Sequence, residues 1–457
     1  MKDYDVLVIG SGSGLSIVYK ALGAGLKTAL VAREYLGGTC LNVGCVPSKT
    51  LLYTADRVME IGEAKRFGVG AEVSSIDFPS IMTRMRKAVQ DGTASIRSGL
   101  KEEADLDFYE EEGQFVDDYT LMAGKEEIRA KTIFVASGAR PAMPPVKGLA
   151  GIGCLTNESV LQLEKLPESI IIIGGSYVGV EYAHFFAAMG SAVSIVEYAD
   201  RLVPFEEPEI SETLESSFAK RMGVYTAHEA LAVEKGDGGF TLTMQDRQTK
   251  TGRTIKGERV LVATGRRSNA DRLMTEKTGV ALTSKGFIRV DNNLQTSRPG
   301  IFAVGDATGR GMFTHAADRE ARIAWHNAFH EHKLEMDFDN VPHAVYTSPQ
   351  IASIGLTEEQ AAGQYGNNML VGKARYEDTV QGDVRMVSSD SFAKALVEKD
   401  TGRILGFHIV GPDASILIQE VVNVMARRGN YREITDAMHI FPSLSELIPE
   451  TLDKLEG

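Results

Sequence analysis

The stretch Leu36-Gly37-Gly38-Thr39-Cys40-Leu41-Asn42-Val43-Gly44-Cys45-Val46-Pro47-Ser48-Lys49 holds two of the three cysteines in this 457-residue chain. In a regular helix, residues five positions apart lie roughly 8.6 Å from one another at Cα. A disulfide needs a Cα separation of about 4.4–6.8 Å. A bond between Cys40 and Cys45 therefore requires a local distortion, and Asn42 and Gly44 are residues that tolerate unusual backbone angles.

The residues after the second cysteine predict the start of a helix. Pro47 suits the first helical turn, because its missing N–H would have no partner there. Cys45 would then lie at the positive end of the helix dipole, which favours a thiolate. The spacing alone fits two buried structural cysteines equally well, but the flanking Gly-Gly-Thr and Pro-Ser-Lys favour a reactive pair.

This stretch resembles the redox-active disulfide of the flavin-dependent pyridine nucleotide–disulfide oxidoreductases. That family includes dihydrolipoamide dehydrogenase, glutathione reductase and mycothione reductase. The resemblance implies that Cys40 and Cys45 form a redox disulfide beside FAD. It also implies that Cys45 holds the charge-transfer thiolate and that Cys40 exchanges with the substrate.

Length and composition limit the possible functions. A chain of 457 residues exceeds a single core, so several domains are expected. The net charge of −13 argues against binding to nucleic acid or to an anionic membrane surface. Glycines interrupt the apolar run from 170 to 196, which favours a buried strand, turn and helix over a membrane span. The acidic N-terminus and the odd cysteine count predict a cytoplasmic protein, and no metal site is expected.

The N-terminus has the pattern of a strand–helix–strand unit. We predict strands at 5–9 and 27–32 and a helix over 15–25, with the glycines of the first turn approaching a pyrophosphate at the helix start. The third glycine of the dinucleotide fingerprint falls on Leu15, with Gly14 one place early, and Glu34 lies two places beyond the expected acidic position. The turn resembles the FAD-binding N-terminus of the family, and Gly-Ser-Gly-x-Ser is especially like mycothione reductase.

A second unit of the same kind begins at the predicted strand 170–173. Gly174 opens its turn, and Glu197 closes the strand 192–196 at 23 residues from Gly174, close to the fingerprint spacing. A carboxylate there accepts a hydrogen bond from a ribose 2′-OH and repels a 2′-phosphate, so NADH is favoured over NADPH. Arg201 nearby keeps NADPH possible. The run Val262–Gly265 repeats the strand-and-small-turn pattern of Val135–Gly138.

The resemblance assigns roles around this second unit. It implies that Tyr177 gates the nicotinamide side of the flavin, although an ordinary packed aromatic is the alternative. It also implies that Glu181 pairs with Lys49 near the flavin. Residues 300–307 resemble the second flavin motif of the family, in which Asp306 would bind the ribityl chain. A helix-capping aspartate is the alternative there.

The resemblance covers nearly the whole chain and implies an α/β fold. Two Rossmann-like domains, for FAD and for NAD(P), would precede a C-terminal α+β dimerisation domain. The expected limits are 1–145 with 268–336 for FAD, 146–267 for NAD(P), and 337–457 for dimerisation. The expected cofactor-binding residues are Gly10, Gly12, Gly14, Gly38, Thr39, Lys49, Gly113, Ser137, Gly138, Gly174, Ser176, Tyr177, Gly179, Glu197, Gly265, Gly305, Asp306 and Ala307. The expected catalytic residues are Cys40, Cys45, Lys49, Glu181, His439, Phe441 and Glu446.

One position departs from the family pattern. The C-terminal motif His-x-His-Pro-Thr-x-x-Glu supplies an acid–base histidine from the partner subunit and a glutamate that orients it. Here the stretch reads His439-Ile440-Phe441-Pro442-Ser443-Leu444-Ser445-Glu446, so phenylalanine occupies the catalytic position. A positioned acid–base contributes about 10²–10⁴-fold to the rate. His439 lies roughly 6–7 Å further along an extended segment and could substitute only after a rearrangement.

These features leave three hypotheses. The first is a homodimeric, FAD-dependent disulfide oxidoreductase acting on a small disulfide or dithiol, like dihydrolipoamide dehydrogenase or mycothione reductase. The second is thioether cleavage, because the family member 2-ketopropyl-coenzyme M carboxylase also has phenylalanine at this position. That enzyme lacks the motif's glutamate, whereas this chain keeps it as Glu446. The third is a flavoprotein subunit that transfers electrons within a larger complex.

Overall fold

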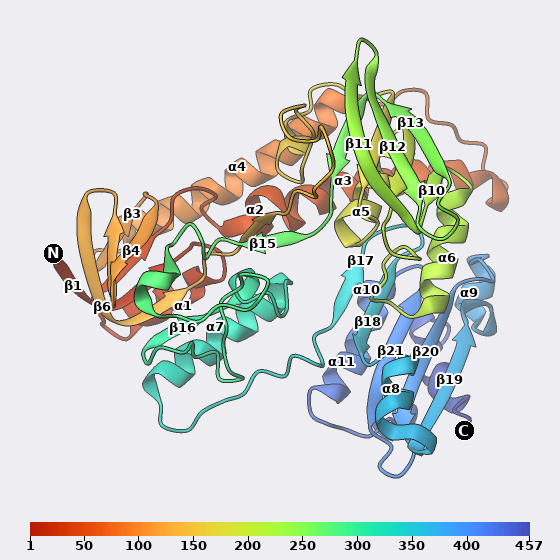
Figure 1. Cartoon of the computed structure of the whole chain (residues 1–457). Coiled ribbons are helices and arrows are strands. Elements are labelled where there is room, and N and C mark those ends of the chain that lie inside the picture. The colour runs from red at the N-terminus through yellow and green to blue at the C-terminus, as the bar shows by residue number, and fades with distance from the viewer.

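The computed structural model describes residues 1–457 and shows three lobes (Figure 1). The N-terminal lobe lies at the left of the view, the second lobe at the upper right and the C-terminal lobe, in blue, at the lower right. Each lobe has at least one sheet of its own. None of the helices combines the length and the apolar character that crossing a bilayer requires.

The first sheet has a parallel core. Its parallel strands, in spatial order, are β3 (Leu106–Tyr109), β2 (Thr28–Val31), β1 (Lys2–Ile9), β6 (Glu126–Val135) and β16 (Ile301–Ala303). The start of β6 also pairs antiparallel with β5 (Thr120–Ala123), which pairs with β4 (Gly113–Asp117). Val6, Leu7 and Val8 are all fully buried, since helices and loops cover both faces of a parallel sheet.

The helices of this lobe carry the cysteines. They are α1 (Gly14–Gly23), α2 (Gly38–Val43), α3 (Cys45–Glu63), α4 (Phe78–Glu102) and α7 (Thr314–Phe329). Helix α1 begins one residue before the predicted 15–25 and ends two residues earlier. The early glycine has a packing role, because a Cβ on Gly14 would lie 2.9 Å from a methyl group of Val8.

The second lobe repeats the parallel pattern. Its parallel strands, in spatial order, are β10 (Gly223–Tyr225), β9 (Ala192–Val196), β8 (Ser169–Ile173) and β14 (Arg259–Val262). An antiparallel sheet of β11 (His228–Gly236), β12 (Gly239–Asp246) and β13 (Gly252–Gly257) lies beside it. The helices are α5 (Tyr177–Ala188) and α6 (Pro208–Ala219).

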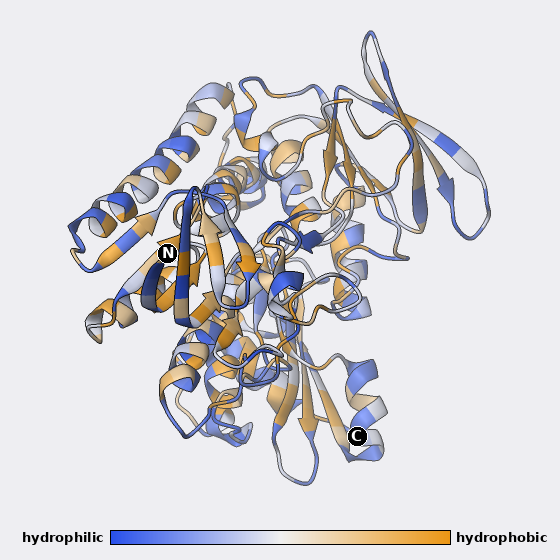
Figure 2. Cartoon of the chain, turned by 60° about the vertical axis from the view of Figure 1, so that its left-hand side comes forward, coloured by the Kyte–Doolittle hydropathy of each residue, from blue (hydrophilic) through white to orange (hydrophobic).

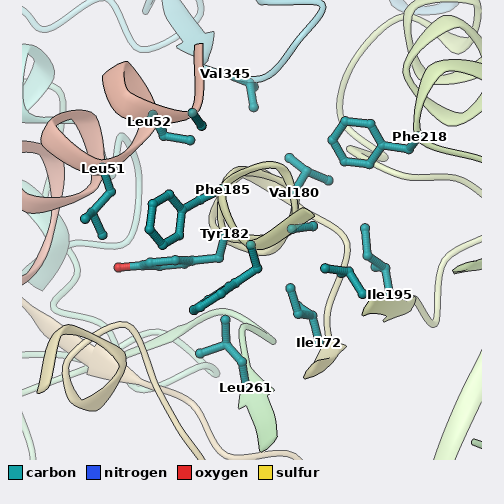
Figure 3. Packing of buried hydrophobic residues seen from close by; sticks show 14 of the residues in the cluster. Leu51, Leu52, Ile172, Val180, Tyr182, Phe185, Ile195, Phe218, Leu261 and Val345 are labelled. Atoms are coloured by element: carbon teal, nitrogen blue, oxygen red, sulfur yellow. The ribbon is translucent and has the colours of Figure 1, made fainter. Parts of the chain in front are cut away.

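Helix α5 is buried along most of its length and packs largely against apolar side chains. Figure 3 shows Phe185 facing Leu51 and Leu52 of α3, while Ile172 and Ile195 of the sheet lie below the helix. A helix with apolar residues all round is typical of a buried position. The helix that follows the second glycine turn is therefore fixed between α3 and the second sheet.

The C-terminal lobe is an α+β unit. Its antiparallel strands, in spatial order, are β17 (His343–Val345), β18 (Ile351–Gly355), β21 (Ile404–Val410), β20 (Phe392–Glu398) and β19 (Met369–Arg375). Its helices are α8 (Glu358–Tyr365), α9 (Val380–Val384), α10 (Ala414–Leu417), α11 (Gln419–Met425), α12 (Arg432–Thr435) and α13 (Leu447–Asp453). Helices α10 and α11 meet at Ile418, and the helical stretch ends before Arg428, which takes a left-handed conformation with φ +54°.

Two short connecting strands join the first and second lobes. β7 (Ala139–Pro141) pairs antiparallel with β15 (Arg266–Ser268), so the chain leaves and returns side by side. Hydrophobic residues concentrate in the sheets and polar residues along the outer helices (Figure 2). We propose that the domain boundaries fall near 145, 267 and 336, since no ladder of paired strands other than β7–β15 crosses between the lobes.

Candidate active site

A break between two helices brings the cysteines together. Helix α2 ends at Val43 and α3 begins at Cys45, with Gly44 between them at φ −131° and ψ −115°. A Cβ on Gly44 would lie 2.8 Å from the carbonyl oxygen of Thr39 and 3.2 Å from the Cα of Cys40. Glycine therefore permits the close approach of the two turns, and this break is the distortion expected from the spacing.

The two cysteines are free thiols whose pKa values are shifted in opposite directions. The hydrogen bond from Cys40 is the largest effect that lowers the pKa of Cys45. Thr314 and the charge of Lys49 lower this pKa further, burial opposes them, and the resulting pKa is about 6. The same hydrogen bond, together with burial, raises the pKa of Cys40. The Sγ of Cys45 lies 3.5 Å from Oγ1 of Thr314, the first residue of α7. At neutral pH the negative charge resides on Cys45.

Helices α3 and α5 are joined by polar pairs. Nζ of Lys49 lies 2.8 Å from Oε2 of Glu181, whose side chain is 9% exposed. The backbone N–H of Tyr346 donates to the other oxygen of Glu181 at 3.0 Å. Further along the same helices, Nε2 of His184 lies 3.4 Å from Oδ1 of Asp56. The helix that carries Cys45 is thus fixed to the helix that follows the second glycine turn.

A cavity of about 1410 Å³ collects residues from all three lobes. Cys40, Cys45, Lys49 and Glu181 line it. The expected cofactor-binding residues that also line it are Gly10, Gly12, Gly38, Thr39, Gly113, Ser137, Gly138, Tyr177, Gly305 and Asp306. Those that do not are Gly14, Gly174, Ser176, Gly179, Glu197, Gly265 and Ala307. One cavity therefore unites the thiols with most of the first glycine turn.

The lining of this cavity fits a flavin dinucleotide. The hydroxyl of Ser137 is buried without a hydrogen-bond partner in the chain, as a ligand-facing group would be. A Cβ on Gly38 would lie 2.5 Å from the Cα of Gly12, so the loop before the cysteines rests directly on the glycine turn. Asp306 lies 3.1 Å from Nε of Arg266 at the cavity wall. Gly305, beside it, donates its N–H to the buried Glu320 at 2.6 Å.

The second glycine turn is built like the first. Gly10 and Gly174 have φ of +106° and +109°, and a Cβ on either would lie within 2.4 Å of the carbonyl oxygen of the residue that follows a neighbouring strand. Glu197 accepts hydrogen bonds from the N–H groups of Gly175 at 2.5 Å and Ala199 at 2.6 Å. These bonds hold its carboxylate at the end of β9. The second strand–helix–strand unit predicted from the sequence thus begins with a glycine turn whose geometry matches that of the first.

Some residues at this cavity or directly behind it could not be recognised from the sequence. Thr314 precedes no recognisable motif, and Glu206 and His343 come from segments without one. Glu206 nevertheless accepts the hydroxyl hydrogen of Tyr177 at 3.0 Å, and Nε2 of His343 lies 2.7 Å from the same oxygen. Only the folded arrangement of separate segments brings these side chains together.

The C-terminal motif lies apart from this cavity. Nε2 of His439 lies 3.0 Å from Oε1 of Glu420 on α11. Glu446 accepts the backbone N–H of Ser443 at 3.0 Å, and Phe441 is 69% exposed. Within one chain, none of His439, Phe441 and Glu446 lines the thiol cavity.

Comparison with known proteins identifies the family of the chain. Residues 4–321 match the pyridine nucleotide-disulphide oxidoreductase family, and residues 341–452 match its dimerisation domain. The chain is 32% identical to dihydrolipoyl dehydrogenase of Bacillus subtilis, covering 100% of this chain and 98% of that protein. It is also 32% identical to mycothione reductase of Mycobacterium tuberculosis, with 99% of each chain covered.

A solved structure shares the fold over the full length. It is the Cu(II) complex of the HOCl-induced flavoprotein disulfide reductase RclA from Escherichia coli, with a TM-score of 0.87, 26% identity and 99% of each chain covered. The expected family and α/β fold class are confirmed. The chain belongs to the pyridine nucleotide-disulphide oxidoreductase family and is a homodimeric enzyme that uses FAD and a pyridine nucleotide to act on a disulfide substrate.

Proposed function

We propose that the enzyme passes electrons from NADH through FAD to the Cys40–Cys45 pair and on to a small-molecule disulfide. The observation that carries the proposal is the polarised thiol pair: the pKa of Cys45 is lowered at the start of α3 while that of Cys40 is raised. An anionic thiol beside a protonated one suits stepwise exchange. A cytoplasmic location, where thiols are kept reduced, suits such a pair.

Each cysteine has a distinct role in the proposed exchange. Cys40, once deprotonated, attacks one sulfur of the substrate disulfide, and the other sulfur leaves as a thiolate that takes up a proton. The Cys45 thiolate then attacks the Cys40 sulfur of the mixed disulfide. This step closes the Cys40–Cys45 bond and releases the second thiolate, which also takes up a proton. Lys49, paired with Glu181, keeps a positive charge near Cys45.

The cavity lining supplies the cofactor contacts. When bound, FAD carries two electrons between the nicotinamide and the cysteine pair. We propose that Gly10, Gly12 and Ser137 hold it, with Asp306 at its ribityl chain and Tyr177 at the nicotinamide side. The fixed carboxylate of Glu197 favours NADH, since it would repel a 2′-phosphate.

The source of the two protons separates this chain from the family pattern. Phe441 has no titratable group, and His439 would have to leave Glu420 before it could serve. We therefore propose that disulfide turnover is slower than the first half-reaction. The half-reaction that reduces the cysteine pair needs nothing from Phe441.

A thiophilic metal ion is a second candidate substrate. Once Cys40 has released its proton to solvent, two Cu(II) ions can each take one electron from the thiolate pair, giving two Cu(I) ions and the Cys40–Cys45 disulfide. No leaving thiolate then requires a proton, which suits phenylalanine at position 441. The similar RclA structure is a Cu(II) complex, which favours testing this candidate.

The test is anaerobic reduction with one equivalent of NADH. We expect the long-wavelength absorbance of a thiolate beside the flavin to appear. Lipoamide, mycothione and Cu(II) are then added separately, and the decay of the band is followed. Fast decay with a disulfide supports the first candidate, and fast decay with Cu(II) alone supports the second. Failure of NADH to produce the band would overturn the proposed electron path.

A further inference from the structure

A buried carboxylate lies behind Tyr177. Glu206, in the segment before α6, is 1% exposed. Its Oε1 accepts the hydroxyl of Tyr177 at 3.0 Å and lies 2.7 Å from Nε2 of His343. Its Oε2 accepts the hydroxyl of Ser353 at 2.5 Å. The carboxylate is therefore satisfied entirely by side chains from three other segments.

These three donors link two lobes. Tyr177 is the first residue of α5 in the second lobe, whereas His343 and Ser353 lie on neighbouring strands β17 and β18 of the C-terminal lobe. Tyr177 and His343 line the thiol cavity, but Ser353 and Glu206 do not. Oε1 of Glu206 thus binds the two side chains that line the cavity, and Oε2 binds Ser353, which does not.

The Tyr177 ring is also held by aromatic contacts. Its centroid lies 5.5 Å from that of His343 and 6.0 Å from that of Phe313. Phe313 stacks on His343 at 5.4 Å and 14°. The next residue, Thr314, is the one that contacts Cys45. Ring contacts set the plane of Tyr177, and Glu206 sets the position of its hydroxyl.

The charge of His343 depends on Glu206. Burial lowers the pKa of His343, but the hydrogen bond and charge of Glu206 and the Val341 carbonyl outweigh it, so the pKa lies above its usual value. Burial raises the pKa of Glu206, and His343 and Ser353 lower it below its usual value. The groups facing His343 are Glu206, the Tyr177 hydroxyl, the Val341 carbonyl and, further off, His408 on β21.

We propose that Glu206 and His343 are positioning residues that latch Tyr177 across the nicotinamide half of the cavity, an inference that rests on the proposed role of Tyr177. The Tyr177 latch, defined as Tyr177, Glu206 and His343, has to release the tyrosine hydroxyl before the ring can move. Only the released fraction binds the nicotinamide, so the latch raises the apparent Kd for NADH.

The latch responds to the proton on His343. When His343 is a cation, it shares Oε1 of Glu206 with the Tyr177 hydroxyl. After His343 loses that proton, Glu206 is a buried anion without a countercharge, and the tyrosine hydroxyl is held more strongly. The apparent Kd for NADH therefore rises with pH through the pKa of His343.

The first test measures His343 directly in the holoenzyme. Histidine labelled with ¹³C at Cε1 is titrated by NMR, and the His343 signal is assigned by its loss in His343→Phe. We expect it to titrate above the usual histidine range of about 6.5 in the wild type. In Glu206→Gln it titrates below that range, because burial then acts without a countercharge. A His343 signal that titrates identically in both proteins overturns the charge pairing.

The second test measures flavin reduction by stopped flow. Glu206→Gln weakens the bond to Tyr177, and the apparent Kd for NADH falls about three- to tenfold while the limiting rate stays within about twofold. His343→Phe keeps the aromatic stack and abolishes the dependence of Kd on pH. Ser353→Ala is the matched control, since it removes a donor from the same carboxylate at the other oxygen and keeps the pH dependence.

The outcomes separate the latch from the proposed function. Equal shifts of Kd in Ser353→Ala and Glu206→Gln would overturn the latch, since a general loosening of Glu206 would explain both. An unchanged pH dependence in His343→Phe would also overturn it while leaving the electron path intact. Flavin that NADH fails to reduce at any pH would overturn the proposed function, and the NMR titration would still test the Glu206–His343 pair.

Discussion

The thiol region and the C-terminal motif differ in how completely one chain builds them. Around the thiols, Cys45 has Thr314 as a neighbour, and Lys49 has Glu181. The C-terminal motif and the residue before it instead present Met438, Ile440 and Phe441, which are 99%, 78% and 69% exposed. A run of exposed apolar side chains on a dimerisation domain is typical of a surface that another subunit covers.

This difference indicates how the reaction is divided. We infer that a single chain, together with the cofactors, contains what the reduction of Cys40–Cys45 needs. The C-terminal motif, which in the family pattern provides the proton for the second half-reaction, does not line the thiol cavity of the same chain. In this chain, Phe441 occupies the position of the acid–base histidine of that pattern. Variants in the two regions should therefore affect different half-reactions.

The largest effect is expected for Cys45→Ser. Serine does not form the disulfide, so turnover of any disulfide substrate should fall by more than about 10³-fold. Reduction of the flavin by NADH should remain within a few fold, because the first electron transfer does not use the thiol. Stopped-flow absorbance measures the first step, and steady-state thiol release measures the second.

Cys154→Ser is the matched control for that variant. Cys154 is a partly buried thiol outside the cavity, and burial raises its pKa, so it should be unreactive. Its replacement should leave disulfide turnover within about twofold. A Cys154 variant as inactive as Cys45→Ser would show that the reactive pair has been misassigned.

Phe441→His places an acid–base group at the exposed C-terminal position. If proton supply limits disulfide turnover, the rate should rise by about ten- to a hundredfold, within the range for general acid–base catalysis. The gain falls short of the maximum because the Glu446 carboxylate, which would orient the imidazole, also accepts the Ser443 N–H. The assay is steady-state reduction of the best disulfide over pH 6 to 9.

His439→Gln tests the remaining histidine. If His439 already supplies the proton after leaving Glu420, this variant loses disulfide turnover, and Phe441→His restores it in the double variant.

A Phe441→His enzyme with unchanged disulfide rates would contradict a proton limitation. Altered products from a thioether substrate would instead favour the thioether hypothesis.

Lys49→Met should weaken the thiol region from within. Glu181, 9% exposed, loses its cation, and unfolding of the apoprotein should become easier by about 1–3 kcal/mol, a range reduced because Lys49 is 35% exposed. Lys49 is among the groups that lower the pKa of Cys45. Its removal therefore raises that pKa, and alkylation of Cys45 by iodoacetamide at pH 6 to 7 slows.

Lys49→Arg keeps the charge and provides the comparison. Its alkylation profile should stay near that of the wild type, with urea unfolding within about 1 kcal/mol. Were Lys49→Met to alkylate at the wild-type rate across this pH range, the charge of Lys49 would not control Cys45.

Much of the backbone structure could be predicted from local sequence. The break at Gly44, the two glycine turns and the strand 192–196 follow from backbone requirements that only a few residue types meet. The family and fold were readable because the cysteine stretch is long and specific. Local rules failed where geometry is less restrictive, as at the end of α11, where a left-handed Arg428 stops a helix that composition would continue.

The parts that were not readable depend on separate segments meeting in space. Thr314 reaches Cys45 only because α7 begins beside α3, and nothing in the residues around Thr314 encodes that contact. Glu206 reads as one acid in an acidic segment, yet it is buried against Tyr177 and His343. Long-range partners of this kind follow from tertiary packing and not from spacing along the chain.

The smallest effect is expected for Glu446→Gln. The carboxylate accepts the backbone N–H of Ser443 in a capping arrangement, and glutamine keeps an acceptor there, so stability should change by less than about 0.5 kcal/mol. Because no histidine occupies position 441, disulfide turnover should change by less than about twofold. In the Phe441→His background the same substitution should lower turnover by about tenfold, since the glutamate then has an imidazole to orient. Equal effects in both backgrounds would show that Glu446 acts in catalysis without a histidine, and the division between the two regions would have to be redrawn.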